Sequence, residues 1–269
     1  MRSILLYANE DSGTIDRVEA ALNLAGAFNA HLHCLQMITP DTFVAMDPFG
    51  GVYPMFDLLE DMREREAKNK QEIDAKLQRA DAPRTWITGT RYPRSSALDR
   101  MALVDLTIVS IPQKDELGDR PPPPARLATQ SNTPVLAIAP GGTRFDAYGN
   151  AMVAWNGSAE AARALCAAVP LLSRAENVTI VHIEEAKPHA LSPTDAAEYL
   201  GYYEIRSDIR EVARSDRITS EVLAEAAALA DASYIVMGAY GHARLQERIF
   251  GGVTQALSTN SNVSLFMAH

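Results

Sequence analysis

The residues best suited to chemistry are glycines that follow an apolar run near the carboxyl end of the chain. Gly238 and Gly241 form a G-x-x-G pair, and nine residues separate Gly241 from the adjacent glycines Gly251 and Gly252. Glycine lets backbone approach another group closely. Because residues 253–257 have helical character, Gly252 is predicted at a helix N-terminus, where free N–H groups and the helix dipole favour an anion. The spacing predicts a phosphate site.

Three basic residues lie between the two pairs of glycines, namely His242, Arg244 and Arg248. Arg244 is the strongest candidate to neutralise phosphate charge. The alternative is that all three are solvated, because basic residues on an exposed loop usually are.

A second loop is predicted to face the same crevice. The apolar run 152–155 leads into Asn156, Gly157 and Ser158, with Ser158 as the expected N-cap of the next helix. In an open parallel sheet the ligand crevice lies beyond the carboxyl ends of the strands, so the loop after Met237 and the loop after residue 155 are expected to meet there.

The elements that must position these loops belong to an internal repeat. The strand-like run 4–9 and the amphipathic stretch with Ile15, Val18, Leu22 and Ala25 recur about 147 residues later, where the stretch carries Ala161, Leu165, Val169 and Leu172. Each copy continues with a second strand, a further matching run and a closing run in the same order, at 31–37, 106–109 and 131–136 in the first copy and at 178–183, 234–237 and 261–266 in the second.

Continuous apolar runs separated by helix-length segments are typical of parallel strands that helices cover on both faces. We therefore predict an α/β fold with two tandem domains of about five strands each, 1–144 and 145–269. The turn formers between Pro140 and Gly149 mark the linker. In the first copy, Met55 to Ala80 is expected to form one long helix, and residues 40–54 a loop.

The glycine spacing after a strand that reads I-V-M-G resembles the nucleotide-binding signature of the universal stress protein family, and the doubled layout resembles its tandem two-domain members. The resemblance implies a five-stranded parallel sheet sandwiched by helices in each half, Rossmann-like and similar to the adenine nucleotide alpha hydrolases. It also implies that loop glycines hold phosphates while the first-strand loop and the end of the second strand hold adenosine. The site implied for this sequence comprises Ala154, Trp155, Asn156 and Ile183 on the adenine and ribose side, and Met237, Gly238, Gly241, Arg244, Gly251, Gly252, Val253 and Thr254 on the phosphate and ribose side.

Two residues depart from the family pattern. Asn156 stands where the family usually has Asp, which keeps hydrogen-bonding capacity but removes a charge. Gly252 stands where Ser or Thr is usual, which deletes a hydroxyl and keeps the backbone N–H. Losing one neutral hydrogen bond costs about 0.5–1.5 kcal/mol, so these changes are expected to weaken binding rather than abolish it.

The first copy lacks the glycine signature. Between residues 109 and 131 it carries extra acids and the prolines Pro121 to Pro124 instead. Prolines have no N–H to donate, and acids repel phosphate. We therefore expect no nucleotide in the crevice of this half, whose role is structural or involves another ligand.

Composition narrows the class of protein. A formal charge of −9 argues against a nucleic-acid binder. The N-terminal apolar run is too short for a signal peptide, and no run reaches the roughly 18 apolar residues of a membrane span. Two cysteines, Cys34 and Cys166, fit a reducing cytoplasm. No metal site is expected, since His31 and His33 share a strand face without a third ligand.

Three functions stay open at the level of sequence. The first is a stress-response binding and regulatory protein whose C-terminal domain holds ATP, or AMP or ADP, with Mg as a companion ion. The second is a tandem scaffold that binds no nucleotide and acts through protein partners or self-association. The third is an enzyme of adenylyl or redox chemistry, but the common catalytic motifs are absent and no general base can be named, so weak ATPase activity is the most we expect.

The closing runs of the two copies are candidate pairing edges. Val135 to Ala139 and Leu265 to Ala268 end their respective repeats. Pairing between them would join the halves as a pseudo-dimer within the chain, and further association to a homodimer is an additional expectation.

Overall fold

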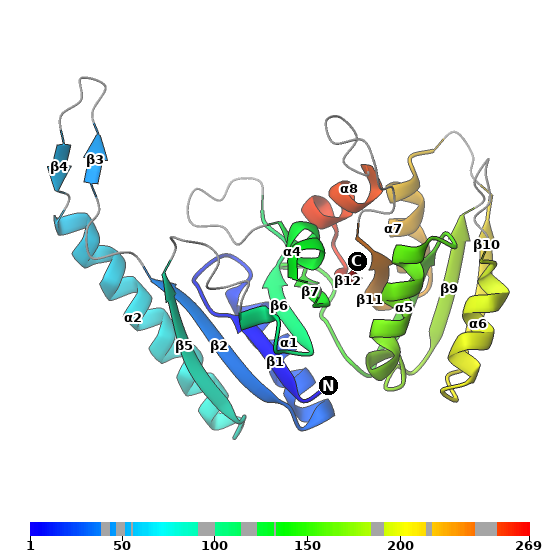
Figure 1. The fold of residues 1–269 in the computed structure, drawn as a ribbon, viewed down its shortest axis with the longest axis horizontal. Helices are drawn as coiled ribbons and strands as arrows, with labels where there is room; N and C mark the ends of the chain where they lie inside the picture. The colour runs from blue at the N-terminus through cyan, green and yellow to red at the C-terminus, as the bar shows by residue number, and fades with distance from the viewer. Residues whose placement is uncertain are drawn as a thin grey trace.

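The computed structural model describes ten segments of the chain, which are residues 1–38, 44–46, 52–54, 56–90, 100–113, 123–131, 133–183, 191–213, 217–239 and 252–269. These residues form one ten-stranded sheet and a separate two-stranded hairpin (Figure 1). The strand order in the sheet is β10-β9-β8-β11-β12-β7-β6-β1-β2-β5.

The N-terminal copy supplies one half of this sheet. Its five sheet strands pair in parallel. Its elements are β1 (Ser3–Tyr7), α1 (Thr14–Phe28), β2 (His31–Ile38), β3 (Val44–Met46), β4 (Val52–Pro54), α2 (Phe56–Arg79), β5 (Arg84–Thr90), β6 (Leu106–Ser110), α4 (Pro124–Ser131) and β7 (Val135–Ile138).

The C-terminal copy supplies the other half, again with five parallel strands. Its elements are β8 (Asn150–Trp155), α5 (Ala159–Leu172), β9 (Val178–Ile183), α6 (Pro193–Gly201), β10 (Asp208–Val212), α7 (Thr219–Leu229), β11 (Ala232–Gly238), α8 (Gly252–Asn260) and β12 (Ser264–Ala268). The predicted α/β class and the predicted number of strands in each half are therefore confirmed in the described part of the chain.

The two halves meet at their closing strands, as the sequence predicted. β7 and β12 pair antiparallel, with Leu136 opposite Phe266 at the centre of the joint. Both side chains are fully buried. The pseudo-dimer is thus one continuous sheet rather than two sheets in contact.

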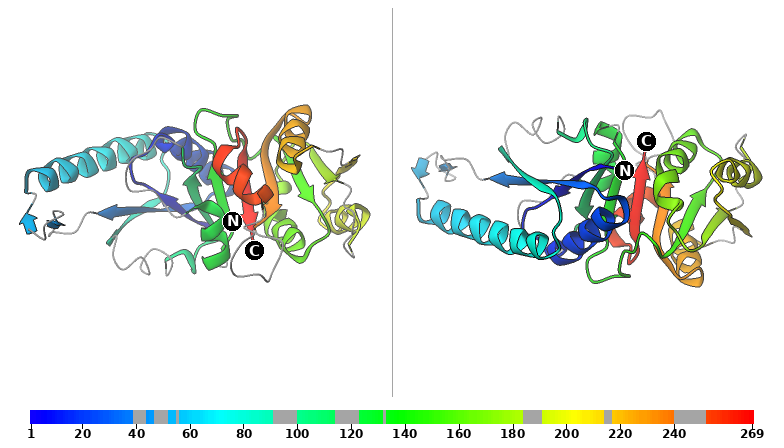
Figure 2. Two further views of the ribbon diagram at one scale, coloured as in Figure 1. Left: turned by 90° about the horizontal axis from the view of Figure 1, so that it is seen from above. Right: turned by 90° about the horizontal axis from the view of Figure 1, so that it is seen from below.

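Helices lie on both faces of the sheet (Figure 2). The buried apolar residues of the strands and helices form two clusters. One cluster contains buried residues of α1, α2, α5 and α6, and the other contains buried residues of α4, α7 and α8. Every residue of β6, β7 and β12 is buried. This burial explains why the strands read as continuous apolar runs, since helices cover both faces.

Three local expectations need correction. The described parts of the predicted loop 40–54 form the hairpin β3–β4, which lies at the end of α2 away from the sheet (Figure 1). Ile15 does not belong to the buried stripe of α1, because its side chain is 59% exposed. The search for apolar runs in the sequence did not find the outer strands β5 and β10. These strands lie at the two edges of the sheet and contain many polar residues, so they have no apolar run.

Two predictions about helices are confirmed. The long helix expected over Met55 to Ala80 is α2, and Ser158 caps α5 by accepting a hydrogen bond from the N–H of Ala161 at 3.2 Å. None of the described helices is both apolar enough and long enough to cross a bilayer.

Candidate functional site

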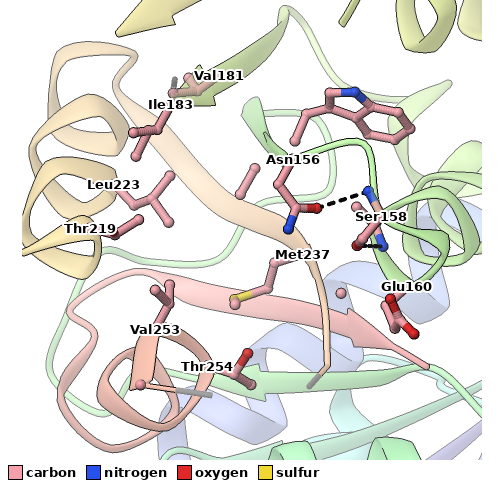
Figure 3. Close-up of a pocket in the computed structure, with 15 residues that line it drawn as sticks. Asn156, Ser158, Glu160, Val181, Ile183, Thr219, Leu223, Met237, Val253 and Thr254 are labelled. Carbon is pink, nitrogen blue, oxygen red and sulfur yellow. Dashed lines mark hydrogen bonds between the residues drawn. The ribbon is translucent and has the colours of Figure 1, made fainter. Parts of the chain in front are cut away.

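A pocket opens at the carboxyl ends of three neighbouring strands of the C-terminal half (Figure 3). It has a volume of about 190 Å³ and lies where the strand order changes direction, between β8 and β11. This is the switch point at which open α/β sheets bind ligands. Its lining residues are Ala154, Trp155, Asn156, Ser158, Glu160, Ala161, Val181, Ile183, Thr219, Leu223, Met237, Gly238, Gly252, Val253 and Thr254.

The structure brings together all of the predicted site residues that it describes. Nine of them line this pocket: Ala154, Trp155, Asn156, Ile183, Met237, Gly238, Gly252, Val253 and Thr254. The other three predicted residues, Gly241, Arg244 and Gly251, lie outside the described residues, as do His242 and Arg248.

Sequence reasoning did not assign the remaining lining residues to the site. Val181 could have been found, because it lies two residues before Ile183 on the same face of β9. The sequence predicts that Ser158 and Glu160 lie at the start of a helix, but it does not indicate that they line a pocket. Thr219 and Leu223 come from α7, whose position over the pocket no motif records.

The pocket has an apolar side and a polar side. Val181, Ile183 and Leu223 gather on one side, and Asn156, Ser158 and Glu160 lie on the other (Figure 3). Apolar walls with a few convergent polar groups are typical of small-molecule sites. The arrangement suits a ligand with a flat apolar part and a polar tail.

Asn156 is held by the turn that follows β8. Its Oδ1 atom accepts a hydrogen bond from the N–H of Ser158 at 3.1 Å, and Gly157 takes the positive φ of 75° that this turn requires. Because the backbone donor must meet an oxygen, the amide nitrogen Nδ2 points the other way, toward the pocket (Figure 3). Within the described part of the chain, Nδ2 has no hydrogen-bond partner.

The N-terminus of α8 forms the end of the pocket near Val253 and Thr254 (Figure 3). The first N–H groups of a helix have no partner within that helix, and the helix dipole adds about half a positive charge there. Among the described residues, none comes within 4 Å of a Cβ atom built on Gly252, so these residues leave this end open. An anion can therefore approach the first turn.

Gly238 has a different reason for being glycine than the one its motif suggested. A Cβ atom at this position would lie 2.7 Å from the carbonyl carbon of Glu160 and 2.8 Å from the backbone nitrogen of Ala161. The group that comes close is thus the first turn of α5. This glycine is required for packing between β11 and α5, whether or not a phosphate binds nearby.

Trp155 also differs from the expectation that it approaches the base. It borders the pocket, but its side chain belongs to the apolar cluster on the opposite face, with Ala161 and Leu200. The indole Nε1 donates a hydrogen bond to the backbone oxygen of Leu191 at 3.3 Å. Successive side chains of a strand point to opposite faces, so Ala154 faces the pocket and Trp155 does not.

The pairing registers allow a comparison with the N-terminal half. Ile108 pairs with Leu136 in the same way that Val236 pairs with Phe266. Leu6 pairs with Ile108 as Val153 pairs with Val236. Counting along each strand from these pairs matches Tyr7 with Ala154, Asn9 with Asn156, Asp11 with Ser158 and Ser110 with Gly238.

Larger and charged side chains occupy these positions in the N-terminal half. Arg17 is fully buried, and its Nη1 atom donates to the two carboxylate oxygens of Asp11 at 2.8 and 2.6 Å and to the hydroxyl of Ser110. Its guanidinium also lies 5.8 Å from the ring centre of Tyr7. Asn9 bonds to both backbone groups of Met37, at 2.7 and 2.8 Å. These contacts bring the chain's own groups to the positions that face the pocket in the other half.

The helix start differs as well. Ser131 and Ser261 make the same turn after α4 and α8, accepting a hydrogen bond from the backbone two residues on. Counting back from these serines matches Pro123 with Val253 and Pro124 with Thr254. Proline has no N–H, so Pro124 at the start of α4 and Pro123 before it lack the donors that Val253 and Thr254 offer.

Electrostatically, the described wall of the pocket is sparse in charge. Among the described lining residues, Glu160 is the charged one. No group of three or more His, Cys, Asp or Glu within the described segments could hold a metal ion.

Comparison with known proteins finds a matching family model and similar folds. A sequence model of the universal stress protein family matches residues 147–269. A universal stress protein from Archaeoglobus fulgidus DSM 4304 is similar in structure over 99% of this chain and 97% of its own, with a TM-score of 0.73 and 16% identity. A functionally unknown protein from Pseudomonas aeruginosa PAO1 is similar over 100% and 92%, with a TM-score of 0.61 and 14% identity.

A shorter match is a universal stress protein in complex with cAMP, which covers 46% of this chain and 99% of its own at 20% identity and a TM-score of 0.33. Among curated protein sequences, none matches this chain.

Proposed function

Because residues 147–269 belong to the universal stress protein family, we propose that the C-terminal half binds an adenine nucleotide in the pocket at the ends of β8, β9 and β11. The protein then acts as a binding and regulatory module in a stress response. The observation that carries this proposal is the meeting of an apolar wall, an oriented amide and a helix N-terminus in one pocket at the switch point of the sheet.

Each part of the pocket has a role in this proposal. The adenine ring packs against Val181, Ile183 and Leu223, where burial of apolar area contributes most of the affinity. The Nδ2 amide of Asn156 donates to the ligand, and the first N–H groups of α8 receive a phosphate. ATP, ADP and AMP each have an adenine ring for the apolar wall and a phosphate for the N-terminus of α8. Mg²⁺ would come with the nucleotide, because no metal cluster lies in the described residues.

The proposed location is the cytoplasm. Both cysteines are free, Cys34 buried and Cys166 exposed. Free cysteines are ordinary in a reducing compartment, and proteins of oxidising compartments more often pair them.

The test is calorimetric titration of the purified protein with adenosine, AMP and ATP, beside thermal unfolding at the same ligand concentrations. A ligand present at 100 times its Kd adds about 2.7 kcal/mol to the free energy of unfolding. Gly252→Asp places a carboxylate at the start of α8, where it stabilises the helix and repels phosphate. We expect this variant to lose most of the affinity for AMP and ATP.

Gly252→Ala is the matched control. The open space around Gly252 accepts a methyl group without a clash, so this variant should bind as the wild type does. If the wild type shows neither heat nor thermal shift with any of the three ligands at millimolar concentration, nucleotide binding is wrong and a scaffold acting through protein partners replaces it.

A further inference from the structure

We propose that two copies of this chain associate through their edge strands β10, which pair antiparallel about a two-fold axis at Ile209. The proposal goes beyond nucleotide binding and does not depend on it. Because β7 and β12 already pair within the chain, the sheet can be extended only from an edge strand.

β10 is the outermost described strand of the C-terminal half (Figure 1). It pairs in parallel with β9 on one side. Four of its five residues, Asp208 to Glu211, are exposed. An edge strand presents backbone N–H and C=O groups that can pair with a strand of another chain. The outer side of β10 is therefore a template for a second strand.

Charged residues usually protect an edge strand from pairing with other chains, but on β10 their signs select one register. Asp208 and Arg210 point to one face of the sheet, and Ile209 and Glu211 to the other. If the joined sheet keeps the faces of both copies, one residue must lie opposite its own copy on the two-fold axis.

Only one choice of this central residue gives complementary charges. With Ile209 at the centre, Asp208 lies opposite Arg210 of the second copy, and Arg210 lies opposite the second Asp208. With Asp208, Arg210 or Glu211 at the centre, a charged residue lies opposite its own copy, and like charges directly opposite destabilise a pair of strands. The charges therefore favour the register centred on Ile209.

Apolar surface accompanies these charges. Ile209 pairs in register with Ile180 of β9, which belongs to the apolar cluster that also contains residues of α6. Because the Ile209 residue is 39% exposed, contact between its two copies would extend this cluster across the axis. Tyr202 and Tyr203, between α6 and β10, are 82% and 49% exposed, and tyrosine is enriched in protein interfaces. The edge thus offers apolar contact beside its ion pairs.

The opposite edge of the sheet, β5, has no such pattern. Arg84 is the one charged residue in the sequence of β5, and it donates to Asp74 of α2 at 2.6 and 3.1 Å. Two copies of β5 would therefore form no ion pair across a two-fold axis. This difference assigns the interface to β10.

Charge reversal tests the register in solution. Arg210→Asp places acids opposite each other across the axis, and Asp208→Arg places bases opposite each other. We expect each variant to raise the Kd of the dimer about tenfold to thirtyfold, because two attractive pairs become repulsive. Sedimentation velocity from micromolar to near-millimolar protein concentration measures the Kd, and circular dichroism checks that the variants fold.

Two combinations should restore the dimer. The double variant Asp208→Arg/Arg210→Asp exchanges the charges and keeps every pair opposite in sign. An equimolar mixture of the two single variants places Arg opposite Asp at both positions, so it should form a heterodimer at concentrations where each variant alone is monomeric. A merely structural role of Asp208 and Arg210 would give neither result.

Thr88→Lys is the matched control, because Thr88 is an exposed residue of the other edge strand, β5. It should leave the Kd of the dimer unchanged. If the wild type is monomeric at all concentrations, or if both charge reversals leave its dimer intact, the proposed interface is wrong. Dissociation by Thr88→Lys would assign the dimer to β5 instead, and a mixture that stays monomeric would contradict the register.

Discussion

Asn156 illustrates how one side chain serves both the fold and the site. Its oxygen accepts the hydrogen bond of the turn at Ser158, and this fixes the direction of its nitrogen. An aspartate could make the same turn but would present a second oxygen to the pocket, where Asn156 presents a donor. The substitution thus changes what the ligand must offer at this point, from a donor to an acceptor.

Asp74 provides a prediction at the scale of a residue. Its carboxylate accepts hydrogen bonds from Arg84, at 2.6 and 3.1 Å, and from the indole Nε1 of Trp86 at 2.8 Å. The bonds from Arg84, followed by that from Trp86, lower the pKa of Asp74 to about 2. A lowered pKa means that the folded state holds the charged form more firmly than the unfolded state does. The resulting stabilisation is present above the unfolded pKa and is lost as the pH falls through the folded one.

We expect the free energy of unfolding to fall by about 1 kcal/mol more in the wild type than in Asp74→Asn between pH 5 and pH 2. This value is smaller than the full shift implies, since solvent screens an Asp74 side chain that is 38% exposed. Urea denaturation at several pH values measures it. Parallel pH curves for the two proteins would show that this contact does not contribute to acid sensitivity.

At the scale of elements, the contrast between α4 and α8 explains how one repeat can offer an anion site and its copy cannot. Around the matched starts of the two helices, Pro123 and Pro124 remove N–H groups that Val253 and Thr254 keep, and α4 begins at Pro124 whereas α8 begins at Gly252. A helix tolerates proline in its first turn because the missing N–H has no partner within the helix. The loss of these N–H groups therefore leaves the helix intact and weakens only the binding of an anion at its N-terminus.

This contrast predicts the effect of Val253→Pro, which copies the residue of the N-terminal half into α8. The helix should form, as α4 does after Pro123, but the affinity for AMP should fall about tenfold or more, because a hydrogen bond to a charged group contributes about 1.5–3 kcal/mol. Calorimetric titration measures the affinity, and circular dichroism checks the helix. Val253→Ala keeps the N–H and serves as the control, so equal affinities of the two variants would contradict a role for this donor.

At the scale of the whole molecule, the antiparallel joint makes one folding unit out of two repeats. Leu136 and Phe266 bury the centre of the joint, and Asn23 of α1 holds the linker by donating to Asp146 at 3.0 Å. The closing strands are used within the chain, so a homodimer would have to form through another surface. This further association remains a prediction.

The joint predicts that both halves unfold together. Trp86 lies in the N-terminal half and Trp155 in the C-terminal half, and the chain has two tryptophans in all. In the single-tryptophan variants Trp86→Phe and Trp155→Phe, the fluorescence transitions in urea should coincide. Phe266→Leu should shift both by about 1 kcal/mol, a size usual for swaps of buried apolar residues. A shift seen only through Trp155 would show that the halves unfold independently.

The amino-acid sequence by itself determined the α/β class, the repeat and the closing strands, and it identified nine residues that the structure gathers in one pocket. It could do so because strand burial and helix starts leave a local pattern along the chain. The division at residues 144 and 145 stays a prediction.

Only the tertiary structure decided that Glu160 and Leu223 join the pocket, that the ring of Trp155 turns to the other face, and that Gly238 packs against α5. It also decided that Arg17 is buried at the matching place in the N-terminal half. A local pattern records that a residue is buried or begins a helix, whereas its neighbours depend on the pairing register and on the helices that cross over each end of the sheet.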